Sequence, residues 1–116
     1  MGYLSYLRLM ELPFDKTLFK LACSEGDIIW RKHTLEKMIV RGISRGEVLE
    51  VLENGEVIRT YDYDKPFPSV LMLGFPGSRP IHVVVSFDET VKSVFVITVY
   101  EPDLTIFEPD FKTKKK

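Results

Sequence analysis

Cysteine is scarce in this chain, since Cys23 is the only one among 116 residues. A single thiol cannot form a disulfide within its own chain, so no disulfide framework holds this fold together. A zinc site built on cysteine pairs is excluded too, and the only two histidines, His33 and His82, lack the close spacing of metal ligands. We therefore predict no metal site and no cofactor. A reducing compartment is expected, by default the cytoplasm.

Excess charge and long apolar runs are also missing. Lysine and arginine number 16 against 17 aspartates and glutamates, so the net charge is -1. Nucleic-acid binders usually show a basic excess, and an anionic ligand here needs a local basic patch. The longest apolar runs are of strand length, far below the roughly 20 residues that span a membrane. Residues 1–10 lack a basic start and a small-residue cleavage site, so we predict neither a signal peptide nor a membrane contact.

The first half of the chain carries helix signals. Asp15 can cap a short helix, and Ser44 with Glu47 has the spacing of a capping box. Gly42 is placed to end the helix before that box. Residues 1–27 form an N-terminal extension, for which a helix is one option. The helices expected from these signals cover residues 16–23, 28–41 and 45–53.

The helix expected over 28–41 has two faces. Its apolar residues cluster at helical spacing and are expected to be buried: Ile28, Leu35, Met38 and Ile39. His33, Lys37 and Arg41 follow each other at i, i+4 and i+8, so they form a polar stripe on the other side. Such a stripe is most often a solvated helix face, but it can also bind an anion.

From residue 56 the pattern changes to β-rich runs separated by turn residues. The runs predict four strands, over residues 56–61, 69–75, 81–87 and 93–100. We predict an α+β fold in which two helices, with a third as a candidate, pack on one face of a four-stranded antiparallel sheet. Residues 28–103 would form the domain and 104–116 a C-terminal tail. The basic end of that tail, 111–116, is expected to be disordered.

Alternation assigns the side chains of the last two strands to faces. His82 and Ser86 share one face of their strand. In the next strand, alternation groups Phe95, Ile97 and Val99 on one face and Val94, Val96, Thr98 and Tyr100 on the other. Pairing as a hairpin brings His82, Ser86, Thr98 and Tyr100 to one side, where we expect a shallow accessible surface.

These residues fit the chemistry of metal-independent RNA cleavage. The reaction needs a base for the 2′-hydroxyl, an acid for the leaving 5′-oxygen and a cation for the charged transition state. Either histidine can act as base or acid near neutral pH. The candidate phosphate ligands are Lys37, Arg41, Arg59 and Arg79, and the candidate stacking or proton-donating groups are Tyr61, Tyr63 and Tyr100. The competing interpretation of His82 is a hydrogen-bonded structural residue.

Three segments, read in order, resemble the DUF4258 family: His33 to Ser44 followed by Glu47-Val48, Leu73-Gly74 with Arg79 to Val85, and Val96 to Pro102. The family looks related to the RelE-like ribonuclease toxins, and its members often lie beside genes for zinc-finger antitoxins of the MqsA kind. The resemblance implies a RelE-like fold, RNA cleavage and neutralisation by a partner protein. The matching polar positions are His33, Arg41, His82, Thr98 and Tyr100.

The resulting assignment is a toxin-type RNA endonuclease. Its predicted catalytic residues are His33, Arg41, His82 and Tyr100, and its predicted substrate-binding residues are Lys37, Tyr61, Arg79 and Thr98. The predicted partners are an antitoxin protein, RNA and a second copy of the chain. Two other functions stay open. One is a protein-interaction module that uses the sheet edge or the N-terminal segment, and the other is RNA binding without cleavage.

Overall fold

The fold is mixed α+β, as predicted, with its helices in the N-terminal half. The computed structural model describes residues 12–116, so the predictions for residues 1–10 lie outside the described residues. Helices within 12–116 are α2 (Lys16–Glu25), α3 (Lys32–Arg41) and α4 (Arg45–Asn54). Strands in the same range are β1 (Ile28–Trp30), β2 (Glu56–Tyr61), β3 (Ser69–Gly74), β4 (Ile81–Asp88) and β5 (Ser93–Tyr100). A short 3-10 turn, η1 (Pro76–Ser78), precedes β4.

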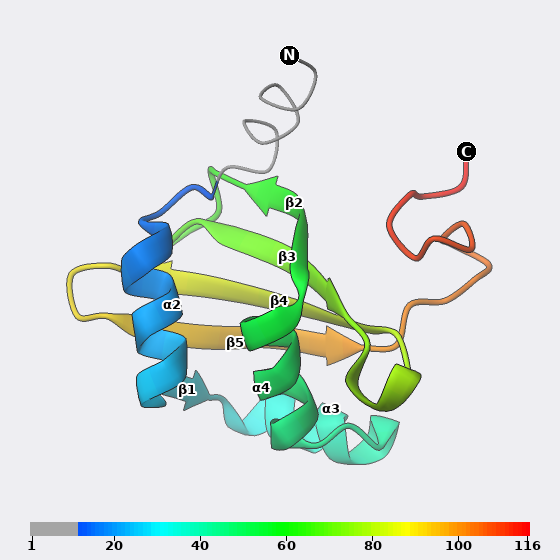
Figure 1. The fold of residues 1–116 in the computed structure, drawn as a ribbon, viewed down its shortest axis with the longest axis horizontal. Coiled ribbons are helices and arrows are strands. Elements are labelled where there is room, and N and C mark those ends of the chain that lie inside the picture. Colours follow the sequence, from blue (N-terminus) through cyan, green and yellow to red (C-terminus); the bar gives the residue numbers. More distant parts are fainter. Residues whose placement is uncertain (1–11) are drawn as a thin grey trace.

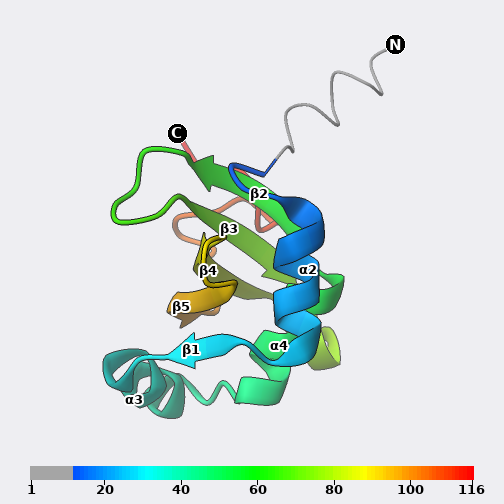
Figure 2. The same ribbon diagram turned by 90° about the vertical axis from the view of Figure 1, so that its left-hand side faces the viewer.

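One sheet organises the molecule, with strand order β1-β5-β4-β3-β2. Strands β2 to β5 form the predicted antiparallel meander. Helices α2 and α4 cover one face of this sheet, whereas α3 lies below β1 and β5 in both views (Figures 1 and 2). Within the described chain, no helix is both long and apolar enough to cross a membrane.

The start of the predicted helix over 28–41 is wrong, because residues 28–30 form a fifth strand. β1 pairs in parallel with β5, with Ile28 opposite Val94 and Trp30 opposite Val96. Two isoleucines and a tryptophan suit a strand, and the pairing partner lies far along the chain, where local periodicity cannot reveal it. The carbonyl of Asp27 accepts a hydrogen bond from the Val94 amide at 2.9 Å.

The buried face of α3 also differs from the prediction. Thr34 and Met38 are buried, while Ile39 is 80% exposed. The Thr34 hydroxyl donates to the carbonyls of Val96 and Ile97 at 3.3 and 3.0 Å. These bonds join the first turn of α3 to β5. In the orientation that they fix, Ile39 points towards solvent.

The predicted caps at Asp15, Gly42 and Ser44 are confirmed. The Asp15 side chain accepts from the Leu18 amide at 2.9 Å, and Ser44 with Glu47 forms a complete capping box. Gly26 and Gly42 end α2 and α3 with φ angles of 78° and 66°, a region that glycine enters at little cost.

The core lies between the sheet and helices α2 and α4. Phe14, Phe19 and Phe87 form an aromatic cluster with ring centroids 5.1 to 5.6 Å apart. Val48, Val51 and Leu52 of α4 are buried. Burying side chains of this size stabilises the fold by about 1.5–3 kcal/mol each.

The predicted disorder of residues 111–116 is wrong, because residues 103–116 fold into a compact segment that we call the cap. Its own backbone bonds include Glu108 amide to Thr113 carbonyl and Lys115 amide to Ile106 carbonyl, both at 2.8 Å. Asp110 accepts from two amides in the same turn. Phe107 is only 4% exposed. The aromatic side chains of the tail therefore anchor it, which its lysine-rich composition does not indicate. The tail follows β5 and is the orange and red end of the chain (Figure 1).

Candidate functional site

Three rows of side chains lie on the sheet face opposite the core, which we call the far face. The core side of the sheet is made by alternate residues such as Met72, Val83 and Val99. Strand pairing aligns the other residues across β2, β3, β4 and β5. The first row is Glu56, Leu73, His82 and Tyr100, the second is Arg59, Leu71, Val84 and Thr98, and the third is Tyr61, Ser69, Ser86 and Phe95.

An irregularity in β5 corrects the predicted parity of that strand. Val84 pairs with Thr98 and Val85 pairs with Val96, so the register shifts between them. Ile97 therefore has no partner on β4. Val94, Val96 and Val99 therefore all face the core, and Thr98 and Tyr100 share the far face with Phe95. The prediction that Thr98 and Tyr100 lie on the side of His82 is confirmed, whereas the grouping with Val94 and Val96 is wrong. A bulge changes the parity of every later residue.

A second irregularity, in β2, brings an arginine to the far face. The register shifts between Val57 and Arg59, and Val57 packs against the core. Without this shift, alternation would send Arg59 and Tyr61 to the core side with Val57. Bulges of this kind commonly re-aim a side chain next to a functional site. Sequence alternation gave no signal of this shift.

His82 lies in the first row and is fully buried, with 0% exposure. One ring nitrogen, Nε2, is 2.7 Å from the carbonyl oxygen of Phe111 and must donate to it. The other, Nδ1, is 3.2 Å from the Tyr100 hydroxyl, which can then donate to the ring. The neutral tautomer protonated at Nε2 satisfies both contacts.

The environment favours the neutral forms of both partners. Burial lowers the pKa of His82, the Arg59 charge lowers it further, and the bond to Phe111 opposes them. Burial likewise raises the pKa of the Tyr100 hydroxyl. At neutral pH the pair is therefore an uncharged imidazole beside a protonated phenol.

The cap covers this pair, so the expected accessible surface around His82 is absent. The Phe107 ring stands edge-on to the imidazole, with centroids 4.8 Å apart. The Lys112 ammonium lies 2.9 Å from the Glu56 carboxylate. The interpretation of His82 as a hydrogen-bonded residue is thus confirmed, and one of its two partners belongs to a segment outside the sheet.

Arg59 is the cation of this cluster. The sequence offers it only as one of four candidate phosphate ligands. Its Nη2 donates to the Lys112 carbonyl at 3.4 Å, a long bond. Its Nε is buried and has no hydrogen-bond partner among residues 12–116. Its charge acts on both His82 and Tyr100. A guanidinium of this kind suits a phosphate or carboxylate.

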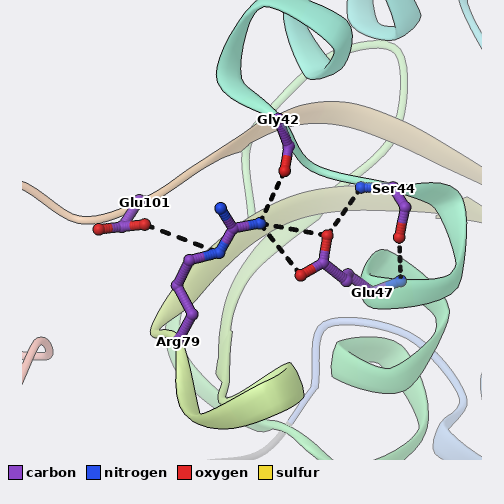
Figure 3. A network of polar contacts seen from close by, with 5 residues as sticks. All are labelled: Gly42, Ser44, Glu47, Arg79 and Glu101. Carbon is purple, nitrogen blue, oxygen red and sulfur yellow. Dashed lines mark hydrogen bonds and ion pairs between the residues drawn. The ribbon is translucent and has the colours of Figure 1, made fainter.

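Arg79 lies in a different network (Figure 3). Its Nη2 contacts both Glu47 carboxylate oxygens at 3.1 and 3.0 Å and the Gly42 carbonyl at 2.9 Å. Its Nε lies 3.7 Å from Glu101. This network lowers the pKa of Glu47, chiefly through the Ser44 amide. Arg79 therefore joins η1 to the turn between α3 and α4.

The polar stripe of α3 is exposed and separate from the far face. His33, Lys37 and Arg41 are all solvent-exposed. The Arg41 guanidinium donates to the Val99 carbonyl at 2.8 Å, next to Tyr100 in sequence. No hydrogen bond or ion pair in the described part of the chain joins His33 to His82. The structure thus brings together His82, Tyr100, Thr98 and Tyr61, and leaves the stripe on α3.

Cys23 is a weak candidate nucleophile. Burial raises the pKa of its thiol to about 11, so the reactive thiolate is scarce at neutral pH. Within residues 12–116, no three histidine, cysteine, aspartate or glutamate side chains gather as metal ligands do.

Comparison with known proteins assigns the family and no activity. Residues 30–101 match the family described as a domain of unknown function, DUF4258. No curated protein and no solved structure matches the chain significantly. The match spans α3, α4 and the four strands of the meander, which carry the far face and the Arg79 network. This chain belongs to the DUF4258 family.

Proposed function

We propose that this protein is a metal-independent RNA endonuclease of the RelE-like toxin type, with its active site on the far face around His82. One observation carries the proposal: a neutral imidazole, a protonated phenol and an arginine whose Nε has no hydrogen-bond partner among residues 12–116 meet there. These are the base, the acid and the cation that RNA cleavage by its own 2′-hydroxyl requires.

His82 acts as the base in this proposal. Its Nε2 faces away from Tyr100, towards the position now held by a carbonyl oxygen. The imidazole takes the 2′-hydroxyl proton while the 2′-oxygen bonds to phosphorus. The Tyr100 hydroxyl can accept from Nδ1 as well as donate to it, so it supports either tautomer.

Tyr100 and Arg59 complete the step. The bond from phosphorus to the 5′-oxygen breaks, and Tyr100 supplies the proton to that oxygen. Arg59 stabilises the added charge on the phosphoryl oxygens. The products are a 2′,3′-cyclic phosphate and a 5′-hydroxyl. Tyr61 and Thr98 lie in the neighbouring rows, where they can hold a base and the backbone.

The α3 stripe extends the site in this proposal. His33, Lys37 and Arg41 are exposed cations or potential cations, suited to the RNA backbone beyond the scissile bond. Arg79 is held by two carboxylates, so its part is to fix the turn between α3 and α4.

A toxin of this type would have a protein antitoxin, and the alternative function is a protein-interaction module. One observation favours protein binding, by an antitoxin or by a second copy of the chain. Ile39 and Val40 on α3 are 80% and 82% exposed, unusual for large apolar side chains. The interaction module predicts that changes at His82 leave partner binding intact.

The test is cleavage of a single-stranded RNA oligonucleotide in EDTA by the full chain. We expect 2′,3′-cyclic phosphate ends and a loss of roughly 100-fold or more in His82→Gln. Tyr100→Phe should lose activity as well, while Tyr63→Phe, which changes a loop tyrosine that is 93% exposed, should not. Equal rates in native protein, His82→Gln and Tyr100→Phe would reject this active site.

A further inference from the structure

We propose that the cap, residues 103–116, is a removable cover that occupies the phosphate subsite of the far face, with Arg59 as the phosphate ligand. This inference rests on the proposed function and adds two points to it. It names the residue that binds the phosphodiester, and it requires the cap to leave before RNA can bind.

The cap places main-chain oxygens where the RNA would place its own. Carbonyls of the adjacent residues Phe111 and Lys112 accept from His82 Nε2 at 2.7 Å and from Arg59 Nη2 at 3.4 Å. An arginine donor suits anionic oxygen, and a carbonyl carries only part of a charge. The Lys112 carbonyl therefore stands in for a phosphoryl oxygen against Arg59, and the Phe111 carbonyl holds the place of the 2′-hydroxyl against Nε2.

Arg59 gains more from a phosphate than from the cap. In the capped state its Nε is buried without a hydrogen-bond partner among the described residues, and its bond to the Lys112 carbonyl is long. A buried donor left without a partner loses its hydrogen bonds to water and gains none in return, which is unfavourable. A phosphate can accept from Nε and a terminal nitrogen together, as arginine forks commonly arrange.

The cap is built to move as one piece. Its backbone hydrogen bonds join residues of the cap itself, and Asp103 and Asp110 close its turns. Its deeply buried anchor is a single ring, that of Phe107, while Leu104 and Ile106 are about half exposed. The family match ends at residue 101, so the cap lies beyond the shared domain.

The two histidines of this chain provide the test. Diethyl pyrocarbonate acylates accessible neutral imidazoles, and peptide mass spectrometry reads His33 and His82 separately. In the native full chain, exposed His33 should react at least about tenfold faster than capped His82. Phe107→Ala should raise the His82 rate by about tenfold, and RNA cleavage with it, because more molecules are open. Ile106→Ala, in the exposed neighbour, should change neither rate.

A second variant loosens the cap without removing core atoms. Lys112→Glu sets two carboxylates against each other where Lys112 now meets Glu56, and it should also raise the His82 rate. If His82 stays protected in both variants, the cap proposal is overturned whatever the cleavage assay shows. If His82 becomes reactive while RNA stays intact, the cap stands and the nuclease proposal falls. Should Phe107→Ala prove unfolded by circular dichroism, Lys112→Glu decides.

Discussion

At the scale of single residues, His82 shows how one side chain can join the sheet to the cap. Both ring nitrogens have partners, yet one partner belongs to the cap and the other is a tyrosine in the same row. In the active site that we propose, opening of the cap would free one ring nitrogen and leave the other bonded to Tyr100.

The lowered pKa of His82 predicts a loss of stability in mild acid. The unfolded chain takes up a proton below about pH 6.5, whereas the folded one resists it until its own lower pKa. The contribution is therefore complete above that pH and is lost as the pH falls towards the folded value. We expect the free energy of unfolding to fall as the pH is lowered from about 7.5 to 5.5, measured by urea titration.

His82→Gln should remove most of that difference, and His33→Gln, which removes the exposed histidine, should keep it. The carboxyls with lowered pKa values, those of Glu47, Asp103 and Asp110, start from 4.5 or 3.8 and act at lower pH. An unchanged pH dependence in His82→Gln would show that another group is responsible.

At the scale of elements, structure that depends on neighbouring residues is predictable from the sequence, and structure that depends on long-range pairing is not. The caps of α2 and α4 and the turns between the strands of the meander are written in neighbouring residues, so these elements were predicted closely. β1 depends on β5, and the direction of Arg59 and Tyr61 depends on a bulge in β2. The cap depends on Phe107 finding the far face of the sheet. None of these three features can be read from residues adjacent in the chain. Strand alternation places His82, Thr98 and Tyr100 on one side, but it cannot place Arg59 there, because that depends on the bulge in β2.

The contact of α4 with β3 predicts opposite effects for two glycines. A methyl group on Gly55 would lie 2.5 Å from the Val51 carbonyl oxygen and 2.7 Å from that of Leu73. Both are backbone atoms, so Gly55→Ala must part helix from strand, at a cost of about 1–3 kcal/mol or more. A methyl group on Gly46, which lies inside α4, would have the Ser44 hydroxyl oxygen as its nearest contact, 3.8 Å away. Gly46→Ala should therefore stabilise the folded protein by up to about 1 kcal/mol.

Thermal unfolding monitored by circular dichroism distinguishes the two glycine variants. A change of 1 kcal/mol moves the midpoint by about 4 °C in a domain of this size. Midpoints shifted in the same direction by both variants would mean that α4 does not sit closely on β3.

At the scale of the whole molecule, stability is unevenly distributed between the sheet and its cover. β4 is central, paired on both sides and almost entirely buried. The cap has local hydrogen bonds and one deeply buried ring. Such a segment belongs to the low end of the range of opening free energies in a folded protein.

Hydrogen exchange should therefore show two levels of protection. We expect the amides of Phe107 and Lys115 to exchange at least about 100-fold faster than those of Val83 and Val85, because the cap opens without the sheet. Denaturant should accelerate exchange in β4 and leave the cap amides nearly unaffected, since little surface is exposed when they open. Equal protection in both regions would mean that cap and sheet open together.

The bulge in β2 has a consequence for the solution behaviour of the protein. β2 and β1 are the outer strands of the sheet, and an outer strand with free amides and carbonyls invites another chain to join it. β1 offers only three residues, and β2 is irregular and carries Glu56 and Arg59. Neither rim is a regular template for strand addition, so the register shift that turns Arg59 to the far face also leaves this edge poorly suited to joining another chain.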